Sequence, residues 1–153
     1  MKMDANKEAE VWRRVRGEQQ PVRPGPMENL QELIMEEWIS ASAYLQLSRQ
    51  MQAKEPAATL QRLFREEQAH AACLKGIYTL VKGTQPTVKT VPAQKERVEI
   101  ALRKCYGREM RSLMEYEKRS DDPEYGPVFA RLAEQEREHC RAVLELIGSL
   151  NGK

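Results

Sequence analysis

Residues 65–70 read REEQAH and residues 133–139 read AEQEREH, so His70 and His139 each follow a glutamate by three positions. Residues three positions apart lie on the same face of a helix, where a carboxylate and an imidazole can reach one metal ion. The chain has 153 residues and only two histidines, and both occur in this Glu-x-x-His pattern. The two segments therefore predict metal ligands on two helices.

Prolines divide the sequence into stretches long enough for helices. All eight prolines fall in four places, and the residues between them are rich in Ala, Leu, Glu, Gln, Arg and Met, which favour helices. Helices are predicted over residues 27–54, 57–82, 93–120 and 128–150. Asp122 is a plausible N-cap of the last one. Long helices joined by short links predict an all-α fold, an antiparallel four-helix bundle.

The link between the second and third predicted helices, GTQPTVKTVPA at residues 83–93, is longer than the other two. Its length permits a long crossover between helices 2 and 3 as parallel neighbours, whereas the other two links are typical of antiparallel hairpins. Residues 1–26 precede the bundle as a short N-terminal extension that ends in a Pro/Gly-rich linker. This extension packs on the bundle or on a partner subunit, or is an untethered arm. The predicted bundle domain covers residues 27–153.

Each predicted helix carries an apolar stripe at steps of three and four, such as the one from Leu60 to Val81. A glutamate interrupts the middle of every stripe. Carboxylates in a bundle core are costly unless they are paired or bind metal, and two divalent cations would balance four of them. The sequence therefore predicts a dinuclear metal site, for which iron or manganese is suited and zinc acceptable. Its predicted ligands are Glu37, Glu67, His70, Glu109, Glu136 and His139.

The levels of these ligands can be checked, because residues that face each other across an antiparallel pair are equidistant from the turn. The midpoints fall near Ala53 for the first pair of helices and at Pro123 for the second, close to the predicted breaks. The register still leaves a choice, since Glu36 or Glu66 could replace the neighbouring glutamate if the stripe shifted by one residue.

Two tyrosines repeat the same spacing from a glutamate, because Tyr44 follows Glu37 and Tyr116 follows Glu109 by seven positions. Each tyrosine can pack in the core with a satisfied hydroxyl, or take part in the site through a hydrogen bond or a redox role. Three cysteines contain no CxxC pair and are expected to pack as buried, inert side chains. They are Cys73, Cys105 and Cys140.

The formal net charge of +2 gives no indication of a nucleic-acid partner. The sequence has no stretch of about 18 apolar residues that could span a membrane, and its first residues do not resemble a secretory leader. The odd number of cysteines argues against a disulfide framework. A cytoplasmic protein without a membrane or nucleic-acid partner is expected.

The segments EEWISASAYL (36–45), REEQAH (65–70), REMRSLMEY (108–116) and AEQEREH (133–139) resemble the ferritin-like superfamily, and within it the rubrerythrin-type di-iron domain. The resemblance covers about residues 27–150. It implies two iron ions, with Glu37 and Glu109 as terminal ligands and one histidine per iron. It further implies that Glu67 and Glu136 bridge the two ions.

The same resemblance implies an oxidoreductase that reduces peroxide or dioxygen. Rubrerythrins usually carry a rubredoxin domain with paired CxxC motifs, which this sequence lacks, so an external rubredoxin-like electron donor is expected. They also carry an additional glutamate where this chain has Tyr106, which puts the peroxidase mechanism in question. A homodimer is expected. The alternatives are a ferroxidase for iron storage, a di-iron hydroxylase of an organic substrate, and a structural bundle with a relic or zinc site.

Overall fold

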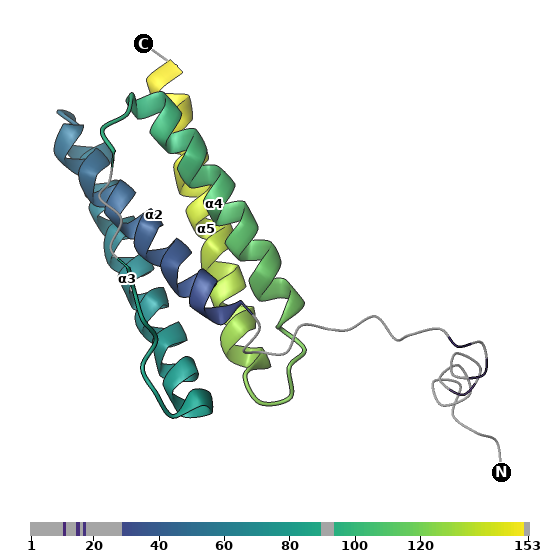
Figure 1. Ribbon diagram of the computed structural model, residues 1–153. Coiled ribbons are helices and arrows are strands. Elements are labelled where there is room, and N and C mark those ends of the chain that lie inside the picture. Colours follow the sequence, from purple (N-terminus) through teal and green to yellow (C-terminus); the bar gives the residue numbers. More distant parts are fainter. Residues whose placement is uncertain (1–10, 12–14, 16, 18–28, 90–93, 152–153) are drawn as a thin grey trace.

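The computed structural model describes residues 11, 15, 17, 29–89 and 94–151. The described residues form four long α-helices and no strand, which confirms the predicted all-helical bundle (Figure 1). The predicted N-terminal extension lies almost entirely outside the described residues. The helices are α2 (Leu30–Gln50), α3 (Lys54–Lys82), α4 (Val98–Lys118) and α5 (Gly126–Asn151).

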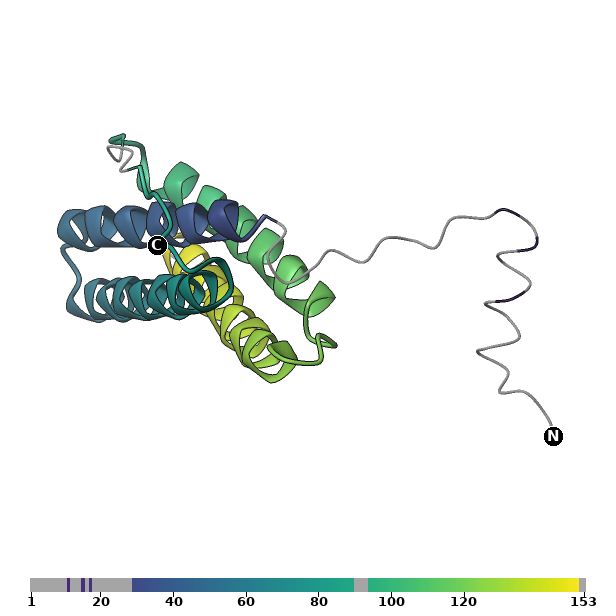
Figure 2. The same cartoon turned by 60° about the horizontal axis from the view of Figure 1, so that its bottom comes forward.

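The helices form two hairpins, in which α2 packs against α3 and α4 against α5. The hairpins meet through contacts of α2 with α4 and of α3 with α5, and Figure 2 shows them crossing at an angle. Each helix runs antiparallel to both of its neighbours in Figure 1. Every helix can therefore bury its apolar stripe between two neighbours whose dipoles oppose its own.

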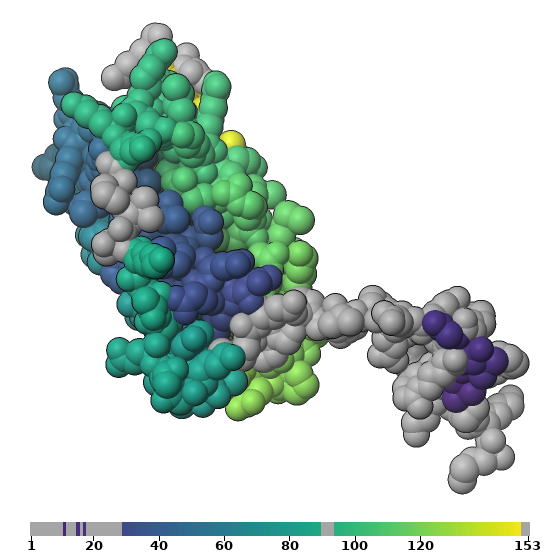
Figure 3. Space-filling model, viewed as in Figure 1, coloured from purple at the N-terminus to yellow at the C-terminus, as the bar shows by residue number. Residues whose placement is uncertain are grey.

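The connection from α3 to α4 leaves α3 at one end of the bundle and enters α4 at the other end (Figure 1). It joins two parallel helices, as predicted, but the expectation that they are neighbours is wrong. Over the described residues α3 and α4 make no close contact, because α2 and α5 lie between them. The described parts of the connection lie along α2 and the last turns of α3 (Figure 3). Gln85 and Pro86 line a pocket with α3, whereas Gln94 and Glu96 line a cavity with α2. The Gln31 side chain of α2 donates a hydrogen bond to the carbonyl oxygen of Thr87.

The two short links lie close to the midpoints calculated from the positions of the glutamates that face each other across each hairpin. Helix α2 ends at Gln50, four residues earlier than predicted, and Ala53 is the N-cap of α3. Pro56 lies in the first turn of α3, where a missing backbone N–H leaves no helical hydrogen bond unmade. Asp122 is not the N-cap of α5. Its carboxylate accepts two backbone hydrogen bonds within the turn that precedes the helix, which begins at Gly126.

The apolar stripes pack into two clusters of buried side chains. One includes Leu30, Ile34 and Phe129, and the other includes Leu60 and Val143. The buried polar side chains of the predicted site come between them along each helix. These two clusters supply most of the favourable free energy of folding and hold the four helices at fixed distances.

The predicted stripe of the second helix is wrong at its end. Val81 is 46% exposed. Helix α3 has 29 residues and α2 only 21, so the last turn of α3 extends past the first turn of its partner. No helix in the described part of the chain is long and apolar enough to cross a lipid bilayer.

Candidate metal centre

Each helix brings its central glutamate to one level of the bundle, where the side chain is buried. The four glutamates are at most 1% exposed, and His70 and His139 are 3% and 1% exposed. One ligand atom from each of Glu67, His70, Glu136 and His139 can be chosen so that all four lie within 4.8 Å of one another. This buried cluster could hold a dinuclear metal site.

The cluster has two halves, one around each imidazole. The Nδ1 atom of His70 lies 2.9 Å from Glu136, 3.6 Å from Glu37 and 3.8 Å from Glu67. The Nδ1 atom of His139 lies 2.7 Å from Glu67 and 3.5 Å from both Glu136 and Glu109. We call these halves the His70 position and the His139 position.

The distances separate the four carboxylates into two kinds. Glu67 and Glu136 approach both imidazoles, whereas Glu37 approaches only His70 and Glu109 only His139. Two carboxylates are thus placed to be shared between two ions, and one further carboxylate and one imidazole are placed to bind each ion. The terminal and bridging roles that the family resemblance implies remain a prediction.

Each tyrosine hydroxyl donates a hydrogen bond to the carboxylate that belongs to one half only. Tyr44 donates to Glu109 at 2.6 Å, and Tyr116 donates to Glu37. Both hydroxyls are buried, and their burial, followed by the charges of the nearby glutamates, raises the pKa of each phenol well above its usual value. The tyrosines therefore keep their protons at neutral pH and hold the carboxylates in a fixed orientation.

The electrostatics of the metal-free cluster depend on the histidines. Burial by itself lowers the pKa of an imidazole, but hydrogen bonds and the charges of the carboxylates outweigh it. The pKa of His70 rises to about 10 and that of His139 to about 11. Burial and the charges of Glu37 and Glu109 raise the pKa of Glu136 well above its usual value. Protons thus take the place of metal charge in the metal-free protein.

The donor set fits a pair of divalent cations. The Oε2 atoms of Glu37 and Glu136 are buried without a hydrogen-bond partner, which is costly for carboxylate oxygens unless a cation is bound there. Two divalent ions would balance the four carboxylates with both imidazoles neutral. Mixed carboxylate and imidazole donors suit iron, manganese or zinc, and the geometry does not choose among them.

Two residues that contact the site were not assigned to it from the sequence. The Nε2 atom of each imidazole is its outer nitrogen, on the opposite side of the ring from the Nδ1 atom that faces the carboxylates. Nε2–H of His70 donates a hydrogen bond to Gln135 Oε1 at 2.7 Å, and Nε2–H of His139 donates one to Glu66 Oε2 at 2.7 Å. From the sequence, Glu66 was expected only as an alternative metal ligand in place of Glu67. Glu66 directly precedes the predicted ligand Glu67, and Gln135 directly precedes the predicted ligand Glu136. This adjacency was the sequence feature that could have indicated their role.

The remaining candidates lie outside the cluster. Glu36 is partly exposed. Cys105 and Cys140 are buried thiols whose burial raises the pKa of each to about 11, so neither is a ready thiolate. Tyr106 packs against the apolar cluster around Leu60. None of these four residues replaces a ligand. Cys73, which was also expected to be buried, is only partly buried.

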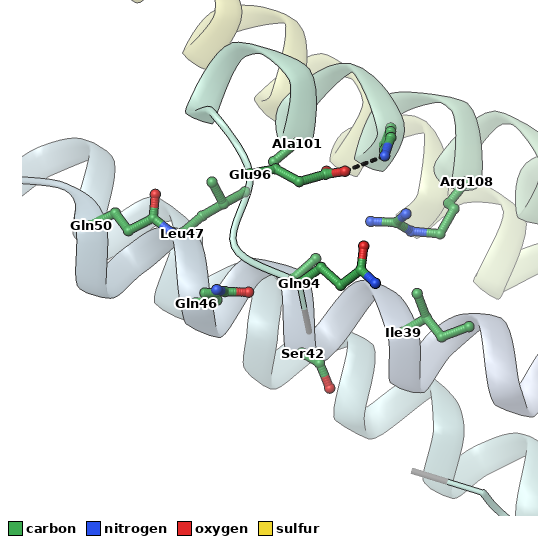
Figure 4. A pocket seen from close by; sticks show the side chains of 11 residues that line it. Ile39, Ser42, Gln46, Leu47, Gln50, Gln94, Glu96, Ala101 and Arg108 are labelled. Carbon is green, nitrogen blue, oxygen red and sulfur yellow. Dashed lines mark hydrogen bonds and ion pairs between the residues drawn. The ribbon is translucent and has the colours of Figure 1, made fainter. Parts of the chain in front are cut away.

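A cavity of about 210 Å³ lies between α2, α4 and the crossover (Figure 4). Figure 4 shows the side chains of Gln94, Glu96 and Arg108 gathered around it. Arg108 donates hydrogen bonds to the hydroxyl of Ser40 at 3.1 Å and to the Cys105 thiol at 3.3 Å. Ser40 and Cys105 lie one turn from Glu37 and Glu109 on their helices, so Arg108 connects the wall of the cavity to the turns next to the candidate site.

Comparison with known proteins does not identify the chain. No model of a known protein family matches it, and no curated protein matches it significantly. The assignment of a function therefore depends on the buried cluster.

Proposed function

We propose that the chain is a ferritin-like oxidoreductase of the rubrerythrin type, which reduces peroxide or dioxygen at a pair of iron ions. A separate, rubredoxin-like protein would supply the electrons. The observation that carries the proposal is the buried cluster in which two glutamates approach both histidines and two approach only one. A purely structural bundle has no need for four carboxylates in its core, because each lowers the stability of the metal-free fold.

Two bound ferrous ions would supply the two electrons that, with two protons, convert one hydrogen peroxide into two water molecules. The protein contributes the ligands and their fixed positions. Glu67 and Glu136 would hold both ions, and the hydroxyls of Tyr44 and Tyr116 orient the other two carboxylates. The apolar clusters on both sides exclude bulk water from the site. Tyr106 occupies the position of the additional glutamate of rubrerythrins. We therefore propose no movement of an iron ion between two alternative terminal carboxylates.

The test begins with metal analysis of protein purified without added metal. The same protein is then loaded anaerobically with two ferrous ions per chain and titrated with hydrogen peroxide. We expect one peroxide to be consumed for each pair of ferrous ions oxidised. The proposal is wrong if the loaded, reduced protein reacts with neither peroxide nor dioxygen.

Variants connect this reaction to the assigned ligands. The double variant Glu67→Gln/Glu136→Gln should lose tight binding of two metals, because neither shared carboxylate remains. The matched control is Glu134→Gln/Glu138→Gln, which changes two exposed glutamates of α5. Retention of two tightly bound metals by the first double variant would refute the ligand assignment.

The same preparation distinguishes the proposed oxidoreductase from an iron-storage protein. Storage requires a large hollow assembly and oxidised iron far in excess of two ions per chain. Size-exclusion chromatography and iron counting after repeated additions of ferrous iron and oxygen would show both. A dimer that retains two ions per chain supports the oxidoreductase.

A further inference from the structure

The metal centre has an approximate two-fold symmetry. The hydrogen bond of Tyr44 to Glu109 is matched by that of Tyr116 to Glu37. The two imidazole rings stack between these pairs, with centroids 5.2 Å apart and planes inclined by 17°. From these contacts alone the two metal positions would be equivalent.

The symmetry is broken at the outer nitrogen of each imidazole. His139 donates its Nε2–H to the carboxylate of Glu66, and His70 donates its Nε2–H to the side-chain amide of Gln135. Both hydrogen bonds are 2.7 Å long, so the difference lies in the charge of the acceptor and not in the geometry. Arg62 contacts both oxygens of Glu66, at 3.1 and 3.2 Å, and fixes the carboxylate in place.

Glu66 is a carboxylate whose oxygens accept hydrogen bonds from His139 and from the guanidinium of Arg62, which stabilise its charged form. Gln135 is neutral at every pH. The two imidazoles therefore have outer partners of different charge, although their inner Nδ1 atoms face equivalent carboxylates.

The outer partner of a metal-binding imidazole affects the metal. A carboxylate that accepts the N–H of the ring increases the electron density at the opposite nitrogen and fixes the orientation of the ring. Loss of such a partner lowers metal affinity by about 10- to 100-fold. An amide keeps the hydrogen bond and loses only the charge, so a difference near the lower end of that range is expected here.

We propose that the two metal positions are unequal, and that the His139 position binds a divalent cation about tenfold more tightly than the His70 position. Glu66 and Gln135 are the positioning residues that create the difference. The inference rests on the metal site of the proposed function, but it does not depend on the reaction with peroxide.

The two histidines allow a direct test, because a ¹⁵N-resolved NMR spectrum of the full chain contains only two imidazoles. Zinc, which is diamagnetic, is added in steps to metal-free protein. We expect the signals of His139 to reach their bound positions before those of His70. Simultaneous saturation of both rings, or saturation of His70 first, would overturn the proposal.

Three variants separate the charge of the outer partner from other differences between the halves. Glu66→Gln should weaken the His139 position, and Gln135→Glu should strengthen the His70 position. In each single variant the two affinities should come within about threefold of each other, as expected when both outer partners have the same charge. Both side chains are at least partly exposed, so the fold should tolerate the changes.

The exchange variant Glu66→Gln/Gln135→Glu is the decisive test. It keeps the composition of the site and should reverse the order, with His70 saturating first. Unchanged order in this variant would overturn the proposal. If wild-type protein binds no zinc, the metal site and the inference both fail. If it binds two zinc ions in the expected order but its iron form does not react with peroxide, only the proposed reaction fails.

Discussion

Replacing Glu136 with glutamine should have opposite effects on the metal-free and the metal-bound protein. Glu136 is fully buried, and one of its oxygens has no hydrogen-bond partner. Its other oxygen accepts a hydrogen bond from His70 at 2.9 Å. In Glu136→Gln the amide oxygen can keep this hydrogen bond, and the new NH₂ group can donate to the carboxylate of Glu37 or Glu109.

The magnitude follows from the cost of bringing Glu136 into the cluster, because its carboxyl is ionised in the unfolded chain and folding must either bury that charge or protonate it. Replacing whole buried ion pairs by uncharged side chains of similar volume is neutral or stabilises by about 1–4 kcal/mol, and the four carboxylates here outnumber the two imidazoles, so loss of one carboxylate leaves no imidazole without a partner. The metal-free variant should therefore be more stable than the metal-free wild type by an amount in this range. A shift of about 1 kcal/mol corresponds to about 2–4 °C in Tm for a chain of this size. The melting temperature should rise by about 2–16 °C.

Bound metal should make wild type more stable than the Glu136→Gln variant, which reverses their order of stability in the metal-free state. A ligand present at 100 times its Kd stabilises the folded state by about 2.7 kcal/mol per site. Wild type should gain this amount at each position, and the variant should lose most of the gain because a shared carboxylate is missing. Chemical denaturation with chelator, and with free zinc or manganese held at about 100 times its Kd for wild type, measures all four states.

The control for this prediction is Glu138→Gln on the exposed side of the same helix, which should change stability by less than about 0.5 kcal/mol in either state. A metal-free Glu136→Gln protein that is less stable than wild type by more than about 1 kcal/mol would refute the reasoning. It would mean that the hydrogen bonds of the cluster already compensate its four carboxylates without metal.

Four further predictions test the surroundings of the site and the fold. Tyr44→Phe removes the donor to a buried carboxylate, so denaturation should show a loss of about 1–3 kcal/mol in the metal-free protein. Since the pKa of His70 is about 10 and that of His139 about 11, each metal displaces about one proton from its imidazole. Affinity should therefore rise about tenfold per pH unit between about pH 6 and 8, and calorimetry in buffers of different ionisation enthalpy should detect the released protons. Gly126→Ala should destabilise by about 1–3 kcal/mol, because its Cβ would lie 2.6 Å from a backbone oxygen of the preceding turn. Gly148→Ala, which meets no atom within 4 Å, should instead stabilise by about 0.5–1 kcal/mol.

The fold was largely predictable because helix-breaking residues and apolar periodicity are local properties. Prolines limited the helices, and the levels of the glutamates placed the first turn at Ala53, where the structure has it. The arrangement of the crossover was not predictable in the same way. A link of this length can join parallel helices at adjacent or at diagonal corners, and only the packing of all four stripes selects the diagonal. Val81 was misassigned for a related reason, because a stripe does not show where the partner helix ends.

The site was predictable to the extent that burial of charge is visible in a sequence. A glutamate on an apolar stripe is noticeable because it opposes the pattern, and all six predicted ligands lie together in the buried cluster. Glu66 and Gln135 do not interrupt a stripe, since they stand at the edge of the helix face. Their contact with the outer nitrogen of an imidazole depends on the rotation of α3 against α5, which local sequence does not specify.

The same interactions explain why the cluster needs a cation and how the chain folds before it binds one. The imidazoles take up protons in the metal-free protein, which gives the four carboxylates a partial counter-charge. This charge is only half of what two divalent ions would provide. The remaining imbalance lies between two apolar clusters whose burial favours folding by a much larger amount, so the bundle can form first and leave the ligands close together. Metal binding then replaces protons in a site that is already assembled, and the free energy that the carboxylates cost the fold becomes part of the affinity for the ions.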